Sequence, residues 1–342
     1  MTPPADLSSL RALSARLGAD PLRIQGPGGN TSVKQGGAMW IKASGAELAE
    51  AERRDIFVNV DLERMRAALA ADALEADQPA LFAKPGALRP SIETSLHAVF
   101  PQRVVLHAHC VDTVALAIRA DARERIAERL GELAFGFVPY VKPGATLAKA
   151  VRRSGGVESG IVVLGNHGLI VAGDSVEAAA ELFARVTQAL AAAPAAFPEP
   201  DREELSRRGG DSYAPPAADH PLHGVALSPW RCEAALAGSL YPDHVVFCGV
   251  GATALPEGET ADALVARFRA ARLAPPPFLL VPGRGALIAN QASPGARALA
   301  RCLGDVLARV PERAPLAYLT EQQIHELIDW DAEKYRRALN VR

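Results

Sequence analysis

Two histidines stand two residues apart at the end of an apolar run, in "VVLHAHC" at residues 104–110. Side chains at positions i and i+2 of a β-strand point to the same side, with Cα atoms about 6.5–7 Å apart. His107 and His109 could therefore both bind one metal ion through neutral imidazole nitrogens. By itself, the spacing is explained more simply by a hydrogen-bonded core histidine beside a second one at the mouth of the strand.

A third histidine and a carboxylate change that balance. His167 lies in "GNHG", between two apolar stretches, and the flanking glycines let the backbone bend and leave room beside its side chain. A histidine in such a turn could also be an ordinary surface residue. Glu93 is expected in the first turn of a helix over "SIETSLHAVF". Three histidines and a carboxylate suit a catalytic zinc ion with an open coordination position.

Six segments of the chain together resemble the class II aldolase/adducin family in their order and spacing. They cover about residues 20–190 and read "GPGGNTSVK", "IKASGAEL", "RPSIETSLHAVF", "VVLHAHC", "VKPGATLAKAV" and "VVLGNHGLIVAGDSVEAAAELFARV". The resemblance implies that His107, His109 and His167 bind zinc and that Glu93 is the acid/base catalyst. It also implies that loops hold the substrate phosphate through Asn30, Ser32, Ser44, Gly45 and Ser91.

The resemblance implies a metal-dependent aldolase. Such an enzyme cleaves a ketose phosphate, here of the rhamnulose-1-phosphate type, into dihydroxyacetone phosphate and an aldehyde, and a divalent ion stabilises the enediolate as a Lewis acid. The C-terminal part resembles the second half of the aldolase region of rhamnulose-phosphate aldolase/dehydrogenase fusion proteins, without their dehydrogenase part. A homo-oligomer is expected, because the family resemblance implies sites at subunit borders.

Two departures from the family pattern keep other functions open. Ile92 stands where sugar-phosphate aldolases of the family carry a second hydroxyl residue, and no tyrosine lies between Cys110 and Pro139 to donate a proton. Lys34, Lys42 and Arg89 could replace the lost phosphate donor, or they could be solvated surface residues. The alternatives are a sugar-acid aldolase or decarboxylase, or a sugar-phosphate epimerase. A non-catalytic binding module, as in adducin, is a third.

Strand and helix signals mixed along the chain predict an α/β or α+β protein. For residues 1–192 the resemblance implies a three-layer αβα sandwich around a central, mostly antiparallel sheet. Residues 193–222 are rich in proline and alanine and are expected to form a linker. Residues 223–342 are expected to form a smaller α/β unit. Because residues 279–307 resemble residues 162–190, this unit could be a shortened repeat, or the two strand–turn–strand–helix units could be alike by coincidence.

Local signals predict individual elements. Helices are expected at residues 5–17, at 91–100 with Ser91 as N-cap, and after Ser175 up to about residue 192. "VVFCGVGATA" at 245–254 suggests a strand followed by a dinucleotide-binding turn. Pro256 and Gly258 interrupt the helix that should follow it, so no nucleotide cofactor is expected.

Composition excludes several classes of partner. A net charge of −2 and 22% charged residues offer no basic excess for nucleic acid. No apolar run approaches the roughly 20 residues of a membrane span, and the N-terminus lacks a signal-peptide core. The four cysteines have no paired spacing, which indicates reduced thiols and a cytoplasmic protein. The resemblance to the aldolase family implies a small sugar or sugar phosphate as the substrate.

Overall fold

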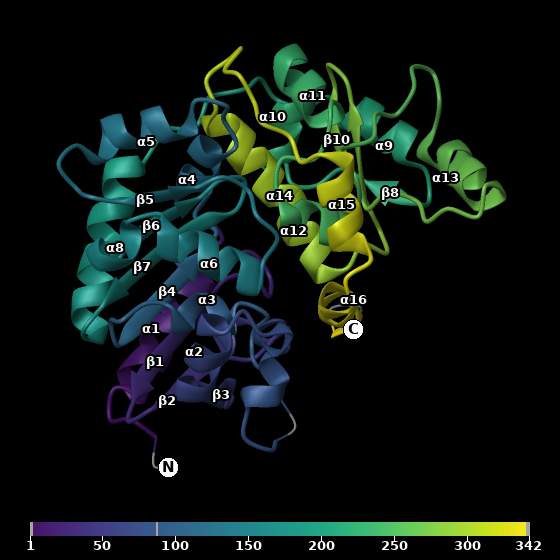
Figure 1. Cartoon of the computed structure of the whole chain (residues 1–342). Helices are drawn as coiled ribbons and strands as arrows, with labels where there is room; N and C mark the ends of the chain where they lie inside the picture. The colour runs from purple at the N-terminus through teal and green to yellow at the C-terminus, as the bar shows by residue number, and fades with distance from the viewer. Residues whose placement is uncertain (1–2, 87, 340–342) are drawn as a thin grey trace. The chain divides into compact units, whose positions relative to one another are not determined.

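The computed structural model describes residues 3–86 and 88–339, shown as a ribbon in Figure 1. A first compact unit consists of residues 1–117 and 121–191. A seven-stranded sheet forms its centre, in the order β3-β2-β1-β4-β7-β6-β5. Its strands are β1 (Asn30–Gln35), β2 (Ala38–Lys42), β3 (Phe57–Asp61), β4 (Val104–Ala108), β5 (Gly136–Val138), β6 (Ile161–Leu164) and β7 (Gly168–Gly173).

The sheet is mostly antiparallel. β5 and β6 run parallel, whereas the other hydrogen-bonded neighbours among its described strands are antiparallel. The predicted α/β class with a central, mostly antiparallel sheet is confirmed.

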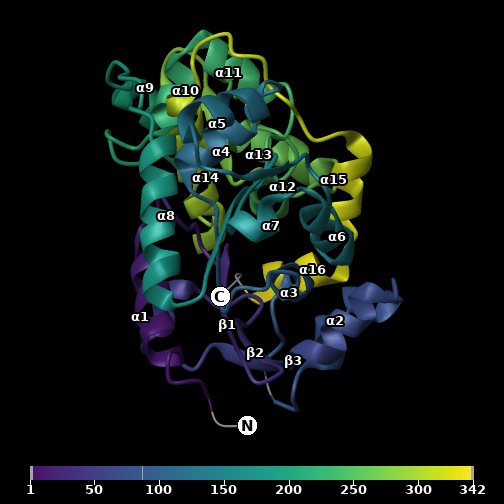
Figure 2. The ribbon, with the colours of Figure 1, turned by 60° about the vertical axis from the view of Figure 1, so that its left-hand side comes forward.

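Helices cover both faces of this sheet because its central strands are apolar on both sides. In β4, Val104 and Leu106 face one cluster of buried side chains, whereas Val105 faces the other. The first face carries α1 (Leu7–Ala19), α4 (Val111–Ala117), α5 (Ala122–Leu130) and α8 (Val176–Leu190). The second carries α2 (Leu62–Ala70), α3 (Thr94–Ala98), α6 (Ala145–Arg153) and α7 (Gly156–Ser159). Figure 2 shows α1 and α8 next to each other on the first face.

Short 3₁₀ segments lie between these elements. They are η1 (Leu48–Glu50), η2 (Leu74–Asp77) and η3 (Pro79–Phe82).

Helix ends match the sequence signals in one place and differ in another. The Ser175 side chain accepts a hydrogen bond from Ala178 N, so it caps α8 as predicted. By contrast, α3 begins only at Thr94, and Ser91 is not its N-cap. The Ser91 hydroxyl instead accepts from the Glu93 amide and from the Asn30 side chain. Residues 92 and 93 form a turn before the helix, which places the N-cap at Glu93, so the prediction of an N-cap at Ser91 is wrong.

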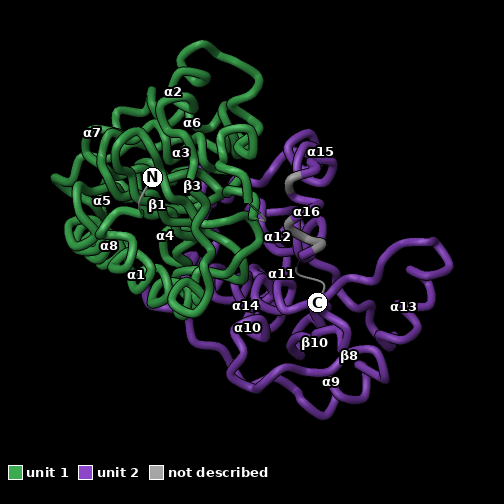
Figure 3. The backbone as a smooth tube through the Cα atoms, turned by 90° about the horizontal axis from the view of Figure 1, so that it is seen from below, with its two compact units in different colours: residues 1–117, 121–191 green, residues 118–120, 192–342 purple. Residues whose placement is uncertain are grey.

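The second compact unit consists of residues 118–120 and 192–342 (Figure 3). Its sheet has the order β8-β10-β9, with β8 (Tyr213–Ala214), β9 (Phe278–Val281) and β10 (Gly285–Ala289). Its helices are α9 (Arg202–Gly209), α10 (Leu222–Leu227), α11 (Pro229–Leu236), α12 (Pro242–Cys248), α13 (Ala261–Ala270), α14 (Pro294–Arg309), α15 (Glu321–Ile328) and α16 (Asp331–Leu339).

The proline-rich segment 193–222 contributes to the core of this unit. It contains α9 and β8, and its Leu205 and Tyr213 are buried with Leu279 and Leu287. The residues expected to form a linker are therefore built into the second unit.

The two segments with similar sequences also have the same order of elements. β6, a turn, β7 and α8 correspond to β9, a turn, β10 and α14. Both pairs of strands are antiparallel, and Ser293 caps α14 through Ala296 N as Ser175 caps α8.

One predicted element of the second unit is wrong. Residues 242–248 form α12 rather than a strand, because Pro242 at the first helical position preorganises a helix. Across the described part of the chain, the helices are all too short or too polar to span a lipid bilayer.

Candidate metal centre

The three histidines lie in β4, directly after it, and in the turn before β7. His107 lies in β4, in register with Asn30 of β1 and Ile170 of β7. His109 follows the end of β4, and His167 lies in the turn between β6 and β7. Asn166 bends that turn with a left-handed backbone at φ 56°. Because β4 and β7 are antiparallel, hydrogen-bonded neighbours, the C-terminal end of β4 and the turn before β7 meet at the same end of the strands.

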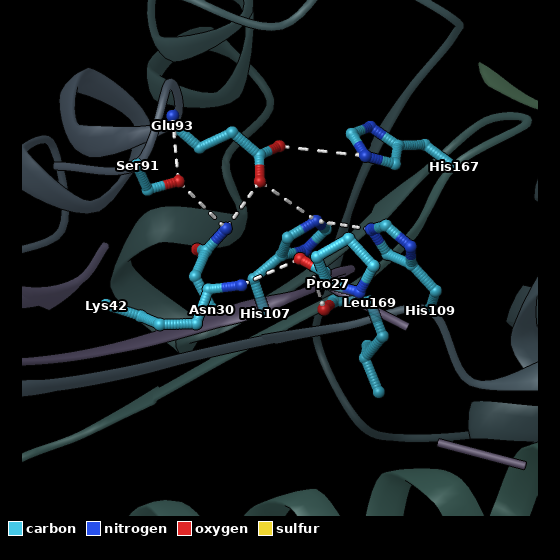
Figure 4. A network of polar contacts seen from close by, with 9 residues as sticks. All are labelled: Pro27, Asn30, Lys42, Ser91, Glu93, His107, His109, His167 and Leu169. Carbon is cyan, nitrogen blue, oxygen red and sulfur yellow. Dashed lines mark hydrogen bonds and ion pairs between the residues drawn. The ribbon is translucent and has the colours of Figure 1, made fainter. Parts of the chain in front are cut away.

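The three imidazoles converge on one point (Figure 4). Their ring centroids are 5.0 Å apart in each pair, and one nitrogen from each lies within 4.8 Å of the other two. The Nε2 atoms of His107 and His109 are 3.2 Å apart. The residues are 1%, 6% and 8% exposed, so they are nearly closed off from solvent. Such a group of buried nitrogens could hold a metal ion.

A backbone carbonyl sets the tautomer of His107. Its Nδ1 lies 3.2 Å from the carbonyl oxygen of Leu169, which can only accept a hydrogen bond, so Nδ1 carries the proton. A neutral imidazole then presents the lone pair of Nε2 toward the other two histidines. Contacts of this kind orient histidine ligands in metal sites. The donor set and its support therefore fit a divalent ion.

The carboxylate of Glu93 faces the same point from the other side. Its Oε2 is 3.4 Å from His107 Nε2, and its Oε1 is 3.6 Å from His167 Nε2. Asn30 Nδ2 donates to Oε2 at 2.7 Å and to the Ser91 hydroxyl at 3.2 Å. Oε1 accepts no hydrogen bond from any described residue. One carboxylate oxygen is thus held by Asn30, and the other remains available.

Glu93 is held in its ionised form. Burial alone would raise the pKa of its carboxyl group. When the histidines are protonated, the charges of His107, His167 and His109 together with the hydrogen bond from Asn30 outweigh burial and lower the pKa of Glu93 to about 2. The side chain is therefore an anion at neutral pH.

Comparison with known sequences identifies the family of the first unit. The sequence model of the Class II Aldolase and Adducin N-terminal domain matches residues 12–193, which is more than half of the chain. The chain belongs to the class II aldolase/adducin family. Membership in this family and its fold support an enzyme of the lyase type.

Individual proteins are similar to the first compact unit of this chain. The "Uncharacterized oxidoreductase YuxG" of Bacillus subtilis (strain 168) is 30% identical over 190 residues, 51% of this chain and 27% of that protein. The matched part thus spans about a quarter of that relative's length. The N-terminal class II aldolase domain of a conserved Thermoplasma acidophilum protein is 27% identical, with a TM-score of 0.50 over 56% of this chain and 94% of that one. L-fuculose-1-phosphate aldolase from Thermus thermophilus is 22% identical, with a TM-score of 0.36 over 54% and 92%.

Several of the predicted phosphate-binding residues of this class II aldolase family member lie in adjoining loops. Ser44 N–H donates to the Arg89 carbonyl at 2.9 Å, and Ser91 N–H donates to the Lys42 carbonyl at 3.1 Å. Gly45 turns the first of these loops with φ +76°. Ser44 and Gly45 therefore lie beside the segment that carries Ser91, which in turn contacts Asn30.

The hydroxyl of Ser32 and two candidate cations are engaged in contacts within the protein. Ser32 Oγ is fully buried and 2.7 Å from His97 Nδ1. Lys42 Nζ donates to the carbonyls of Pro27 and Ala46, and Lys34 Nζ to those of Phe100 and Gln102. Burial, and then the nearby Arg66, lower the pKa of Lys34 well below its usual value.

Sequence reasoning missed Gln25 and the Leu169 carbonyl. Gln25 Nε2 donates to the carbonyls of Pro21 and His109, which ties the glycine-rich loop to the end of β4. A glutamine before a glycine-rich loop is the only sequence signal for this contact. A backbone acceptor such as Leu169 leaves no signal in its residue type.

Gly168→Ala is expected to weaken the metal site. A Cβ at residue 168 would lie 2.6 Å from the Ala108 carbonyl oxygen and 3.2 Å from His109 Cδ2. The backbone of β7 must then move away from β4, which separates His167 from His109. We expect metal affinity to fall by roughly 10–100-fold, as when a ligand's support is lost. Titration with zinc against a competing chelator measures this.

The matched control is Gly86→Ala. A Cβ at Gly86 would meet only Lys84 O, at 3.9 Å. This variant should bind zinc like the wild type. If Gly168→Ala also binds zinc with wild-type affinity, the close approach of β4 and β7 is not required for the site.

Proposed function

We propose that this protein is a zinc-dependent aldolase that cleaves a ketose phosphate of the rhamnulose-1-phosphate type into dihydroxyacetone phosphate and an aldehyde. The observation that carries the proposal is the convergence of His107, His109 and His167 on a point that the Glu93 carboxylate also faces. When bound there, the ion would supply Lewis-acid stabilisation of the negative charge that develops on the substrate.

Glu93 has the properties that an acid/base catalyst needs at this place. Its carboxylate is ionised, and Oε1 is free of hydrogen bonds from the described residues. Asn30 holds Oε2, so the side chain keeps its direction while Oε1 exchanges a proton. We propose that Glu93 takes the proton from the carbon next to the ketone in condensation and returns it in cleavage.

The substrate phosphate would bind beside this centre. We propose that Asn30, Ser44, Gly45 and Ser91 hold it, since the loops that carry the last three adjoin each other and Asn30 contacts both Ser91 and Glu93. Backbone N–H groups and hydroxyls in such loops are good donors to phosphate oxygens.

A second candidate keeps the scaffold but changes the substrate. An aldolase or decarboxylase for a sugar acid, or an epimerase, is favoured by Ile92 and by the Lys34 and Lys42 ammonium groups, which donate to backbone carbonyls. A non-catalytic module is less well supported, because binding alone does not require three histidines facing a buried carboxylate.

Metal analysis and a product assay test these alternatives. Purified protein should contain about one zinc ion per chain, bound at this set of donors. Phosphorylated ketoses, non-phosphorylated ketoses and sugar acids should be assayed side by side, with detection of dihydroxyacetone phosphate, of the aldehyde and of carbon dioxide. Release of dihydroxyacetone phosphate supports the aldolase. Turnover of sugar acids alone, or formation of an epimer without cleavage, would support the second candidate instead of the aldolase. A metal-free, inactive protein would support a binding module.

The protein is expected to be a homo-oligomer in the cytoplasm. Residues 111–138 contain no tyrosine to serve as a proton donor, so we propose that a neighbouring subunit supplies one. The four cysteines are buried free thiols, which suits a reducing compartment. Sedimentation velocity at micromolar concentration should give a mass above that of one chain. A fully active monomer would contradict the expected assembly.

A further inference from the structure

One face of β1 carries three polar side chains in a row. Asn30, Ser32 and Lys34 alternate along the strand, so all three point toward the layer that contains α3. All three are buried, at 3%, 0% and 5% exposure. Polar groups are costly to bury unless they are hydrogen-bonded. Apolar residues would cover the same surface at a lower free-energy cost of burial. The presence of three polar residues here therefore needs a specific explanation.

Each of the three binds a successive part of the segment that carries Glu93. Asn30 donates to Glu93 itself at 2.7 Å. Ser32 Oγ lies 2.7 Å from Nδ1 of His97, one turn further along α3. Lys34 Nζ donates to the carbonyls of Phe100 and Gln102 at 2.6 and 2.9 Å, beyond the end of the helix. The segment is thus attached to β1 at its start, middle and end.

The segment needs such attachment because α3 is short. A helix of five residues has too few internal hydrogen bonds to be stable alone, so its position depends on tertiary contacts. Hydrogen bonds are directional and fix both distance and angle. The contact between Ser32 and His97 therefore limits how far α3 can slide along β1. The backbone N–H of His97 donates to the backbone carbonyl of Glu93 at 3.1 Å, which connects the two residues directly.

His97 is held in one orientation by this contact. The side chain is fully buried, and its Nε2 has no hydrogen-bond partner among the described residues. Ser32 is thus the group that binds its ring. Without the hydroxyl, the ring would be buried with both nitrogens unsatisfied, and the segment would shift or loosen to reach water or another partner.

We propose that Ser32 is a positioning residue that aligns Glu93 through His97, rather than a ligand of the substrate phosphate. This inference rests on the proposed acid/base role of Glu93. Ser32 supports the catalytic carboxylate at a distance and touches neither substrate nor metal. Its loss should therefore lower kcat and leave substrate binding intact, because a displacement of the base of about 1 Å is enough to slow proton transfer.

Thr31 provides a matched control on the same strand. Its hydroxyl is also fully buried and also makes a side-chain hydrogen bond of 2.7 Å, to Ser14 of α1. It points to the opposite face of the sheet, away from Glu93. Ser32→Ala and Thr31→Val each remove one buried hydroxyl from β1, and both should lower Tm by a few degrees.

The two variants should differ in catalysis and in local motion. For Ser32→Ala we expect kcat to fall by roughly 10–100-fold, with KM and zinc content within about twofold of wild type. Amide hydrogen exchange over residues 93–100 should quicken by about tenfold or more in this variant. Thr31→Val should keep the wild-type kcat and the wild-type exchange over residues 93–100. Ser32→Thr, which restores a hydroxyl, should recover most of kcat.

Other outcomes would overturn the assignment. A raised KM with unchanged kcat in Ser32→Ala would make Ser32 a substrate ligand. Unchanged kcat and exchange would show that the contact is dispensable, and equal losses of kcat in both variants would indicate general destabilisation. If Ser32→Ala does not fold, Ser32→Cys, which fills the site with a somewhat larger side chain and makes a weaker hydrogen bond, is measured instead. If wild-type protein binds zinc but turns over no substrate, the proposed function fails, while the exchange comparison still decides the positioning role.

Discussion

His109→Ala is expected to yield a protein that holds no metal and has no activity. The three imidazoles come from the end of β4 and from the β6–β7 turn, and the ring of His109 lies 5.0 Å from each of the other two. Without it, two nitrogens and a carboxylate remain, which is a weaker set for zinc than three imidazoles. Because a preformed set of donors makes the site, loss of one should abolish both metal content and turnover. Elemental analysis and an activity assay on the same preparation measure the two.

Thermal unfolding separates loss of the ion from loss of the fold. Zinc that binds the folded state alone raises Tm, so wild type treated with a chelator should melt lower and recover on zinc addition. His109→Ala should melt like the chelated wild type and show no response to zinc. His325→Ala, which removes an exposed imidazole from α15, should keep full metal content and activity. A full complement of zinc in His109→Ala would mean that the ion binds elsewhere.

The convergence of the three histidines could be predicted because its sequence signals are local. The spacing of His107 and His109 puts both on one side of a strand, and glycines beside His167 indicate a tight turn. The sheet then brings these segments together, because an apolar strand on each side of the turn must pair in the core. Likewise, Ser175 followed by an apolar helix pattern predicts α8, and its hydroxyl does cap that helix.

The residues around the centre could not be assigned from local patterns. Ser91 has the residue type of an N-cap, but its hydroxyl accepts from Asn30 of β1, 61 residues away, as well as from the nearby Glu93 amide. The contacts of Ser32 and Lys34 also could not be predicted, since they depend on which segment packs over their face of the sheet. A cation near a glycine-rich loop suggests an anion site, whereas Lys42 in the fold binds carbonyls. The hydrogen-bond partners of polar side chains in a core are determined by the tertiary structure rather than by local propensities.

Glu93→Gln is expected to retain zinc within about twofold and to lose roughly 10²–10⁴ in kcat. Glutamine keeps the shape of the side chain, and its carbonyl can still accept the hydrogen bond that Asn30 donates to Oε2. It cannot take up a proton as a carboxylate does. The three histidines remain in place, so metal content should change little. Single-turnover rates and zinc content, measured on one preparation, test both parts of the expectation.

A merely structural Glu93 would behave differently. An acidic residue at a helix start contributes about 0.3–1 kcal/mol of stability through the helix dipole, without any effect on rate. Glu93 stands at the N-cap of α3 but makes no capping hydrogen bond, and its carboxylate points to the histidines instead. Asp61→Asn is the matched control, because Asp61 does cap α2 through Arg64 N and lies at the exposed end of β3. It should keep its kcat. If Glu93→Gln also keeps its kcat and loses only a few degrees in Tm, Glu93 is a structural residue and another group must move the proton.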